Sequence, residues 1–129
     1  MTEILARDVM IKDVHTVSAD RKVAFARLMM LRHNIGALPV VDNKRVLVGI
    51  ITQRDIDLAG SDVSDLFVSD LMTRSLVKAN ETSPLRWIVE QMIKTGIQRI
   101  PVVDGDSRLL GLVTQTSVIK ASLMYNLLK

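Results

Sequence analysis

Hydrophobic residues recur along this chain in short blocks, and the same succession of blocks occurs twice. Each half begins with a short extended stretch, 14–17 or 76–79, which is followed by apolar residues at helical spacing. Two brief apolar runs around a polar turn then complete each half, at 38–41, 46–51, 100–103 and 109–113. Such runs separated by turn residues are typical of hairpin strands. The pattern therefore predicts a β-α-β-β-α unit in each half.

Different signals predict the helices of the two halves. In the second half, Ser83 is expected as the N-cap and Pro84 as the first helical residue, because proline needs no amide partner there. In the first half the helix is expected over 22–33, where apolar residues occupy nearly all sides. Such a helix is expected to be buried on more than one side. Further helices are predicted to begin at Thr52 and at Thr114.

The two halves are copies of each other at a constant offset of 62 residues, which carries Pro39 onto Pro101 without a gap. We therefore predict two repeats, 4–60 and 66–125, each too small to bury a sheet face alone. The expected fold class is α/β (α+β), with the two repeats packed sheet to sheet. The matching segments are DVM (8–10) with DLM (70–72), IGALPVVD (35–42) with IQRIPVVD (97–104), and LVGIITQ (47–53) with LLGLVTQ (109–115).

Composition excludes several kinds of chemistry. The 129 residues include no cysteine and two histidines, His15 and His33, so neither a thiol nucleophile nor a Cys-ligated zinc site is available. The motifs G-x-S-x-G, H-E-x-x-H and G-x-G-x-x-G are absent, so we expect no enzymatic activity. The net charge of +3 permits anionic ligands. Nucleic acid is not an expected partner, because aromatic stacking residues and clustered basic runs are lacking.

The chain also lacks the signals of export and membrane insertion. Its start has no apolar core typical of a signal peptide, and its longest apolar run, 46–51, is too short to span a bilayer. We therefore expect a cytoplasmic protein with no membrane contact. The final stretch, 122–129, is predicted to extend the last helix with an apolar stripe that includes Leu123, Met124, Leu127 and Leu128.

The duplicated motifs resemble those of a known family. A hydrophobic-Pro-Val-Val-Asp strand, a Gly-x-x-Thr-x-x-Asp junction at 49–55 and a tandem copy are similar to the cystathionine-β-synthase (CBS) domain, which in pairs forms a Bateman module. The resemblance covers 4–121. It implies a non-catalytic regulatory module that binds AMP, ADP, ATP or S-adenosylmethionine in clefts between the repeats. It also implies a homodimer and a downstream protein partner whose identity the sequence does not give.

The residues Thr52 and Asp55 admit two interpretations. A carboxylate can accept hydrogen bonds from both ribose hydroxyls, but Thr-x-x-Asp is also a capping pair favoured at a helix N-terminus. The residues alone leave both open, and the resemblance assigns Asp55 to ribose. The second copy has Ser117 at the equivalent position, so a weaker or empty site is expected there.

The resemblance implies two composite ligand sites. In the first, Arg99 is expected to bind phosphate, because a guanidinium is suited to that group. The alternative is a ligand-free dimerisation module, which the missing second acid favours. The first set comprises Thr52, Asp55, Val77, Lys78, Ile97, Gln98 and Arg99, and the weaker second set comprises His15, Ile35, Gly36, Ala37, Thr114 and Ser117.

Overall fold

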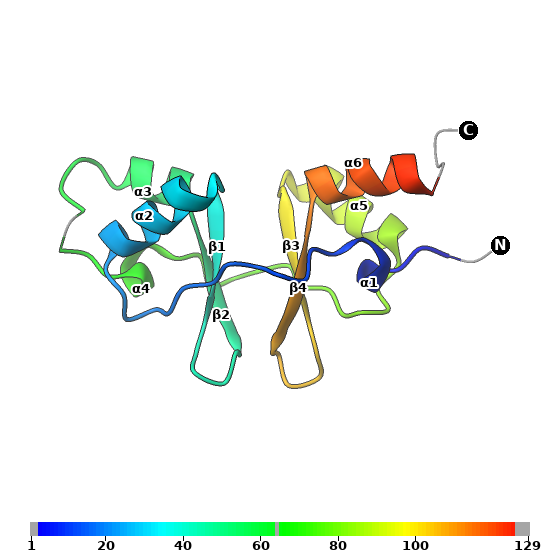
Figure 1. Cartoon of the computed structure of the whole chain (residues 1–129), viewed down its shortest axis with the longest axis horizontal. Helices are drawn as coiled ribbons and strands as arrows, with labels where there is room; N and C mark the ends of the chain where they lie inside the picture. Colours follow the sequence, from blue (N-terminus) through cyan, green and yellow to red (C-terminus); the bar gives the residue numbers. More distant parts are fainter. Residues whose placement is uncertain (1–2, 64, 126–129) are drawn as a thin grey trace. The chain divides into compact units, whose positions relative to one another are not determined.

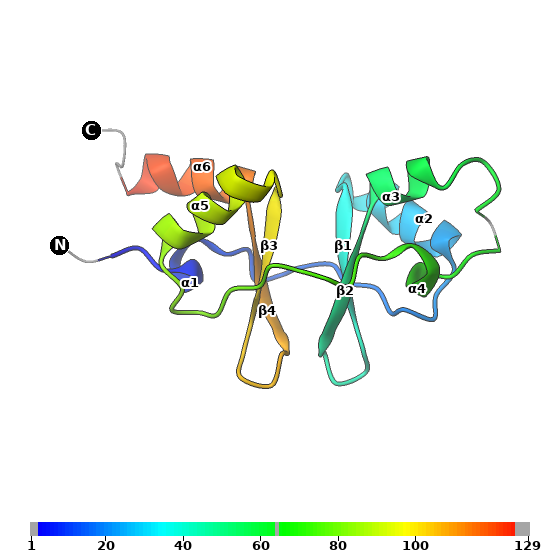
Figure 2. The ribbon, with the colours of Figure 1, turned by 180° about the vertical axis from the view of Figure 1, so that it is seen from behind.

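The computed structural model describes residues 3–63 and 65–125, which form a mixed α/β fold (Figures 1 and 2). The chain divides into two compact units. The repeat-1 unit is His15–Leu76, and the repeat-2 unit combines Met1–Val14 with Val77–Lys129. In chain order the elements are α1 (Ala6–Val9), α2 (Val23–His33), β1 (Ala37–Val41), β2 (Leu47–Thr52), α3 (Gln53–Leu58), α4 (Val68–Leu71), α5 (Leu85–Thr95), β3 (Arg99–Val103), β4 (Leu109–Thr114) and α6 (Gln115–Met124).

Each unit is built on an antiparallel hairpin, β1–β2 or β3–β4. Ala37 pairs with Thr52 in the first hairpin, and Arg99 pairs with Thr114 in the second. Both hairpins contain an irregularity at the equivalent place, before the last residue of the Pro-Val-Val strand. The predicted hairpins are confirmed to within one residue at each strand end, and the helices of each unit cover one face of its hairpin (Figure 1).

An aspartate side chain organises each hairpin turn. Asp42 Oδ1 accepts the amides of Lys44 and Val46, both at 2.9 Å. Asp104 repeats this arrangement with Asp106 and Arg108, also at 2.9 Å. Bonding of a carboxylate to amides two and four residues ahead fixes a tight turn. The pKa of Asp104 is lowered chiefly by the bond from the Arg108 amide, because that bond stabilises the carboxylate form. The aspartate of each Pro-Val-Val-Asp motif therefore has a structural role.

Two further segments flank each hairpin. The lead-in runs parallel to the first strand, with hydrogen bonds from the Val17 amide to the Pro39 carbonyl at 3.1 Å and from the Ala79 amide to the Pro101 carbonyl at 2.9 Å. On the other edge, Thr73 and Ile50 exchange antiparallel hydrogen bonds of 2.8 and 3.0 Å. These flanking segments extend the two strands that the hairpin pattern predicts, although each lead-in forms a single bridge rather than a strand.

The N-terminal segments are exchanged between the repeats. Ile11, in the first repeat of the sequence, exchanges hydrogen bonds of 2.9 and 3.0 Å with Leu112 of the second. Helix α1 accordingly packs on β4 and α6. The equivalent segment of the second repeat, α4 with Thr73, belongs to the repeat-1 unit. Sequence analysis did not predict these two short helices or their exchange.

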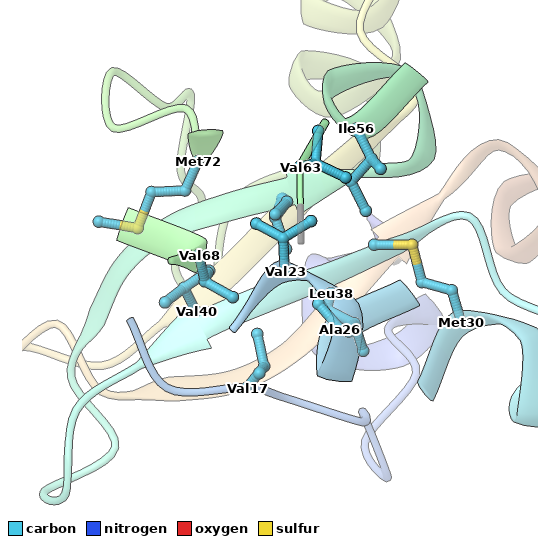
Figure 3. Packing of buried hydrophobic residues seen from close by; sticks show 11 residues of the cluster. Val17, Val23, Ala26, Met30, Leu38, Val40, Ile56, Val63, Val68 and Met72 are labelled. Carbon is cyan, nitrogen blue, oxygen red and sulfur yellow. The ribbon is translucent and has the colours of Figure 1, made fainter. Parts of the chain in front are cut away.

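Two aliphatic cores occupy equivalent positions in the two units. Equivalent core residues differ in size between the units: Val23 and Ala26 correspond to the larger Leu85 and Ile88, whereas Val17 corresponds to the smaller Ala79. The exchanged helices contribute to both cores. Figure 3 shows the repeat-1 core, which comprises Val17, Val23, Ala26, Met30, Leu38, Val40, Ile51, Ile56, Val63, Val68 and Met72. The repeat-2 core comprises Ala6, Val9, Ala79, Leu85, Ile88, Met92, Ile100, Val102, Val113 and Ala121.

Two expectations about helices were wrong. Pro84 is itself the N-cap of α5, with an extended ψ of 140°, because it pairs with Leu5 of the exchanged segment; Ser83 does not cap the helix. Helix α2 is buried on one side only, since Leu28 and Leu31 are 51% and 71% exposed.

The last helix continues as predicted through Met124. Leu123 and Met124 are exposed, whereas Leu127 and Leu128 lie outside the described residues.

Gly49 and Gly111 permit the exchanged segments to approach the hairpins. A Cβ atom on Gly111 would lie 2.8 Å from the Ile11 carbonyl oxygen and 2.7 Å from the Met10 sulfur. A Cβ atom on Gly49 would lie 2.9 Å from the Thr73 carbonyl oxygen. These distances are shorter than van der Waals contact, and the carbonyls cannot withdraw without loss of the strand pairing. Glycine is therefore required in both Gly-x-x-Thr-Gln segments.

We predict that Gly111→Ala lowers the free energy of unfolding by about 1–3 kcal/mol, because the added methyl group must displace the Ile11 backbone. Urea denaturation measures the change. Gly105→Ala is the matched control, since no atom lies within 4 Å of a Cβ there, and its effect should stay within about 0.5 kcal/mol. Equal effects of the two substitutions would contradict the assigned role of Gly111.

Candidate functional site

Thr52 and Asp55 lie at the junction between β2 and α3. Thr52 is the N-cap of α3, and its Oγ1 accepts the Asp55 amide at 3.1 Å. Asp55 Oδ2 in turn accepts the Thr52 amide at 2.9 Å. This reciprocal pair is a capping box, so the structural interpretation of the motif is confirmed. The pair occupies one carboxylate oxygen, and no hydrogen bond from the described residues reaches Asp55 Oδ1. Capping therefore leaves half of this carboxylate available to a ligand.

Ser117 forms a more closed version of the same cap. Its Oγ accepts the Thr114 amide at 2.9 Å and donates its hydrogen to the Thr114 carbonyl oxygen, also at 2.9 Å. The Ser117 amide donates to Thr114 Oγ1 at 3.0 Å. Ser117 is 7% exposed, whereas Asp55 is half-buried. The hydroxyl hydrogen is thus committed within the helix start, and burial restricts access to the oxygen. Both junctions therefore have the cap, but only the Asp55 junction has a carboxylate oxygen that the cap does not use.

Each junction lies beside the residues that precede the first strand of its own unit. Ala37 pairs with Thr52, and the Gln53 amide donates to the Gly36 carbonyl at 2.8 Å. In the repeat-2 unit Arg99 pairs with Thr114. Hairpin register produces these neighbours, and it could have been deduced from the turn length. Sequence analysis instead joined each threonine to residues of the other repeat, and that composite arrangement stays a prediction.

The other predicted residues differ in their surroundings. Arg99 is half-buried and forms no ion pair with the residues described, so its guanidinium charge is available to an anion. Val77 and Ile97 are partly buried and pack against the repeat-2 core. Gln98 is exposed, and its carbonyl accepts the Gln115 amide at 3.1 Å. Within the repeat-2 unit, backbone pairing thus places Arg99 and Gln98 beside the Thr114 junction.

His15 contacts His33, a partner that sequence analysis missed. The two imidazole rings are stacked, with centroids 3.7 Å apart and an interplanar angle of 16°. The pKa of His33 is lowered chiefly by burial, then by the charges of His15 and Arg32. No local pattern could have indicated this pair, because the residues are distant in sequence and meet only when α2 packs beside the lead-in.

Two cavities lie away from these junctions, at equivalent places near the hairpin turns. The repeat-1 cavity has a volume of about 830 Å³ and is lined by Arg21, Arg74, Asp20 and Asp42 among apolar residues. The repeat-2 cavity, of about 660 Å³, includes Lys78 from the predicted site, together with Trp87 and Asp104. Arginines and aspartates are balanced in the larger cavity, so its charge selects neither an anion nor a cation.

Metal-ligating side chains do not converge in this structure. Across 3–63 and 65–125, no three His, Asp or Glu residues are grouped in a way that could hold a metal ion. Over the same residues, no helix is long and apolar enough to cross a membrane.

Comparison with known proteins identifies the duplicated unit. The CBS domain model matches twice, at residues 6–61 and 68–124. The chain is 40% identical over 115 residues to inosine-5'-monophosphate dehydrogenase of Methanocaldococcus jannaschii, and this match covers 89% of the chain but 23% of the enzyme. It is 33% identical to L-aspartate semialdehyde sulfurtransferase of the same organism over 88% of the chain and 22% of that protein. The chain thus spans less than a quarter of these curated relatives.

Solved structures of CBS pairs match nearly the whole chain. The CBS domain pair of protein MJ0100, in complex with 5'-methylthioadenosine and S-adenosyl-L-methionine, has a TM-score of 0.86 and 31% identity, covering 96% of this chain and 99% of that one. CBSX2 in complex with AMP has a TM-score of 0.88 and 27% identity, covering 95% and 98%. The predicted fold class is confirmed by these similarities.

We predict that Ser117→Ala lowers the free energy of unfolding by about 1–2 kcal/mol, because the Thr114 amide and carbonyl both lose a partner. Asp55→Asn should cost less, about 0.3–1 kcal/mol, since an amide oxygen can still accept the Thr52 amide while the charge at the helix start is lost. Urea denaturation measures both changes. Thr116→Ala, at an exposed position in the first turn of α6, is the control. A cost for Ser117→Ala no larger than that of the control would contradict the cap.

Proposed function

The chain belongs to the CBS domain family as a tandem pair, and we propose that this pair is a non-catalytic regulatory module that binds an adenine nucleotide or a related adenosyl ligand. The observation that carries the proposal is the half-used carboxylate of Asp55. Oδ2 holds the start of α3, which fixes the orientation of the group, and Oδ1 remains to accept a ribose hydroxyl. A capped carboxylate is a pre-oriented acceptor, so capping and ligand binding support each other here.

The remaining residues of the first set supply the other parts of an adenosine ligand site. Arg99 provides a guanidinium without an ion-pair partner among the described residues, which suits a phosphate group. Val77 and Ile97 provide apolar surface for adenine. Two similar CBS pairs were solved in complex with AMP, or with 5'-methylthioadenosine and S-adenosylmethionine. These ligands share the adenosine group and differ in charge, so we propose that adenosine is the common determinant and that Arg99 favours a phosphate.

The second set is proposed as the weaker site. Ser117 has no charge, and its hydroxyl hydrogen already bonds to the Thr114 carbonyl. Ribose binding there would lack the acceptor that Asp55 offers. The two sites are therefore expected to differ in affinity for one ligand.

Ligand-free dimerisation is the second candidate function, and exposed apolar side chains favour it. Leu31 on α2 and Ile93 on α5 occupy equivalent positions in the repeats and are 71% and 79% exposed. Leu58 on α3 and Leu123 on α6 are each 74% exposed. Large apolar side chains that remain exposed on helices can be covered when two copies associate. We propose that the module is a homodimer in either case, and that ligand binding distinguishes a sensor from a purely structural dimer.

We predict that Asp55→Asn weakens adenosine-ligand binding by about 10- to 100-fold, corresponding to the loss of a charge-assisted bond of roughly 1.5–3 kcal/mol. Calorimetric titrations with AMP, ADP, ATP, NAD and S-adenosylmethionine identify the ligand and measure the change. Asp57→Asn is the matched control. Asp57 lies on the same helix and is exposed, and it accepts a hydrogen bond from Gln53 at 2.9 Å.

Each outcome of that experiment has a separate meaning. If Asp55→Asn leaves affinity within about twofold of wild type, the carboxylate is a cap only and the ribose assignment is wrong. If none of the ligands binds or raises the melting temperature of the wild-type protein, the sensor proposal fails in favour of the dimerisation module, because ligand bound to the native state must stabilise it.

We predict that the wild-type protein has a solution mass close to twice the 14.4 kDa of one chain, and that the double substitution Leu31→Gln with Ile93→Gln shifts it toward the monomer. Loss of two exposed apolar side chains weakens association, because burial of each contributes about 1.5–3 kcal/mol. Light scattering at micromolar concentration measures the mass. Arg27→Gln, an exposed change on α2, is the control. A wild-type mass near 14.4 kDa would contradict the homodimer.

A further inference from the structure

The cavity near the hairpin turn of the repeat-1 unit has an apolar wall and a charged rim. Its volume is about 830 Å³, which is in the range of small-molecule sites, and all of its lining residues belong to that one unit. The apolar lining residues are buried or partly buried, whereas the charged ones are exposed. The wall comprises Val17, Phe25, Val41, Val48 and Met72, and the charged residues of the rim are Asp20, Arg21, Asp42 and Arg74.

The charged side chains of this rim do not neutralise one another. Among the residues that the structure describes, no ion pair joins either arginine to either aspartate, and the Asp20 carboxylate accepts no hydrogen bond. A ligand with a single charge meets like charges at the same rim, which disfavours it. A ligand that has both a positive and a negative group can satisfy both kinds of side chain. The cavity therefore suits a zwitterion with an apolar part.

Asp20 and Arg21 are held in place by helix α4. The Ala19 carbonyl accepts the Ser69 amide at 3.0 Å, and the Arg21 carbonyl accepts the Val68 amide at 2.8 Å. Backbone hydrogen bonds on both sides of Asp20 thus fix the segment in which two opposite charges follow each other directly. A binding site gains from groups whose positions are set before the ligand arrives.

The guanidinium of Arg21 is oriented by an aromatic ring. Its Cζ atom lies 3.7 Å from the centroid of the Phe25 ring. Stacking of this kind uses the face of the guanidinium and leaves the N–H groups that point outward in its plane. Two such N–H groups can bind both oxygens of one carboxylate. Asp20, the neighbouring residue, offers the complementary acceptor for an ammonium group.

We propose that the repeat-1 cavity binds a free α-amino acid with an apolar side chain. The ammonium and carboxylate groups of such a molecule are attached to one carbon atom, so the side chains that recognise them must be neighbours, as Asp20 and Arg21 are. Arg21 binds the carboxylate, Asp20 binds the ammonium group, and the apolar wall contacts the side chain. This inference goes beyond the proposed adenosine site and does not depend on it.

The equivalent cavity of the repeat-2 unit lacks the neighbouring charges. Thr82 and Ser83 occupy the two positions, and the charged residues Lys78 and Glu81, which also line that cavity, are not consecutive. Trp87 lines it as well and is the only tryptophan of the chain. Amino acid binding in the repeat-1 cavity should therefore leave the fluorescence of Trp87 unchanged.

Calorimetric titration of the full chain with L-leucine and L-phenylalanine at neutral pH tests the proposal. Each is compared with the analogue that lacks the amino group, isocaproate or hydrocinnamate, and with the analogue that lacks the carboxylate, isoamylamine or phenethylamine. We expect both kinds of analogue to bind at least about tenfold more weakly, because each loses one charged contact. Glycine should also bind more weakly, since it has no side chain for the apolar wall.

Substitutions at the rim test the assigned contacts. Asp20→Asn and Arg21→Gln should each weaken amino acid binding by about tenfold. Arg21→Lys should restore only part of the affinity, because it keeps the charge but loses the planar pair of donors. Lys44→Gln is the matched control, since Lys44 is exposed in the same hairpin turn but does not line the cavity. Melting temperatures show that each variant is folded.

NMR amide shifts locate the bound amino acid. Signals of 16–21 and 41–43 should move on addition of L-leucine. The proposal is overturned if neither amino acid binds in the millimolar range, if a singly charged analogue binds as well as its parent, or if Asp20→Asn and Arg21→Gln leave affinity unchanged. A change in Trp87 fluorescence without movement of those signals would also overturn it. These outcomes are distinct from failure of the adenosine site, because Asp55 does not line this cavity.

Discussion

The close backbone approach at Gly49 and Gly111 is the constraint on which the rest of the structure depends. Each glycine allows a segment of the other sequence repeat to pair with a hairpin strand. That segment contains Thr73 in one unit and Ile11 in the other. Because those segments begin with α4 and α1, the same contact places Val68 in one core and Ala6 in the other. Neither compact unit corresponds to one continuous repeat, so each repeat needs the other to complete its core. Duplication is thus a requirement of folding as well as a feature of the sequence.

The strand that contains the glycine also positions the residues of the candidate site. Three residues after Gly49 the strand ends at Thr52, whose hydroxyl starts the next helix and meets the Asp55 amide. The position of the carboxylate is therefore determined by backbone geometry that the core already fixes. This explains how capping and ligand binding, which look like competing explanations from sequence, can belong to one side chain with two oxygens. In the second repeat the smaller Ser117 accepts the Thr114 amide and donates its hydroxyl hydrogen to the Thr114 carbonyl, so it offers neither a charge nor a free hydrogen.

Sequence patterns predicted the parts of this fold that depend on local periodicity. The ungapped repeat, both hairpins and the caps at Thr52 and Thr114 all follow from apolar spacing and turn chemistry. The failures share a different cause. Pro84 is a cap because Leu5 pairs with it, and Leu31 is exposed because the core contacts only one side of α2. Both depend on which distant segment packs where, and local pattern does not contain that information.

The candidate site divides in the same way. The Thr-x-x-Asp motif was visible as a motif, and its two interpretations could be stated before the structure was known. Three features could be seen only in the structure, because each depends on the direction of a side chain. They are the free oxygen of Asp55, the bond from the Ser117 hydroxyl to the Thr114 carbonyl, and the stacking of His15 on His33. Hairpin register was a signal that could have been used: it places Ala37 beside Thr52 and Arg99 beside Thr114.

The repeats differ mainly at positions where the shared backbone does not require one particular residue type. The glycines, the turn aspartates and the cap threonines are the same in both copies, and each has a backbone reason. Asp55 and Ser117 both accept the amide of the cap threonine, and Val77 and Thr95 stand where the first repeat has His15 and His33, so the shared backbone does not require identical side chains at these positions. A duplicated module that keeps its backbone chemistry and varies these side chains acquires two junctions with unlike side-chain chemistry. The Asp55 junction keeps a carboxylate oxygen beyond the one that caps the helix, whereas the Ser117 hydroxyl has no charge and already donates its hydrogen to the Thr114 carbonyl.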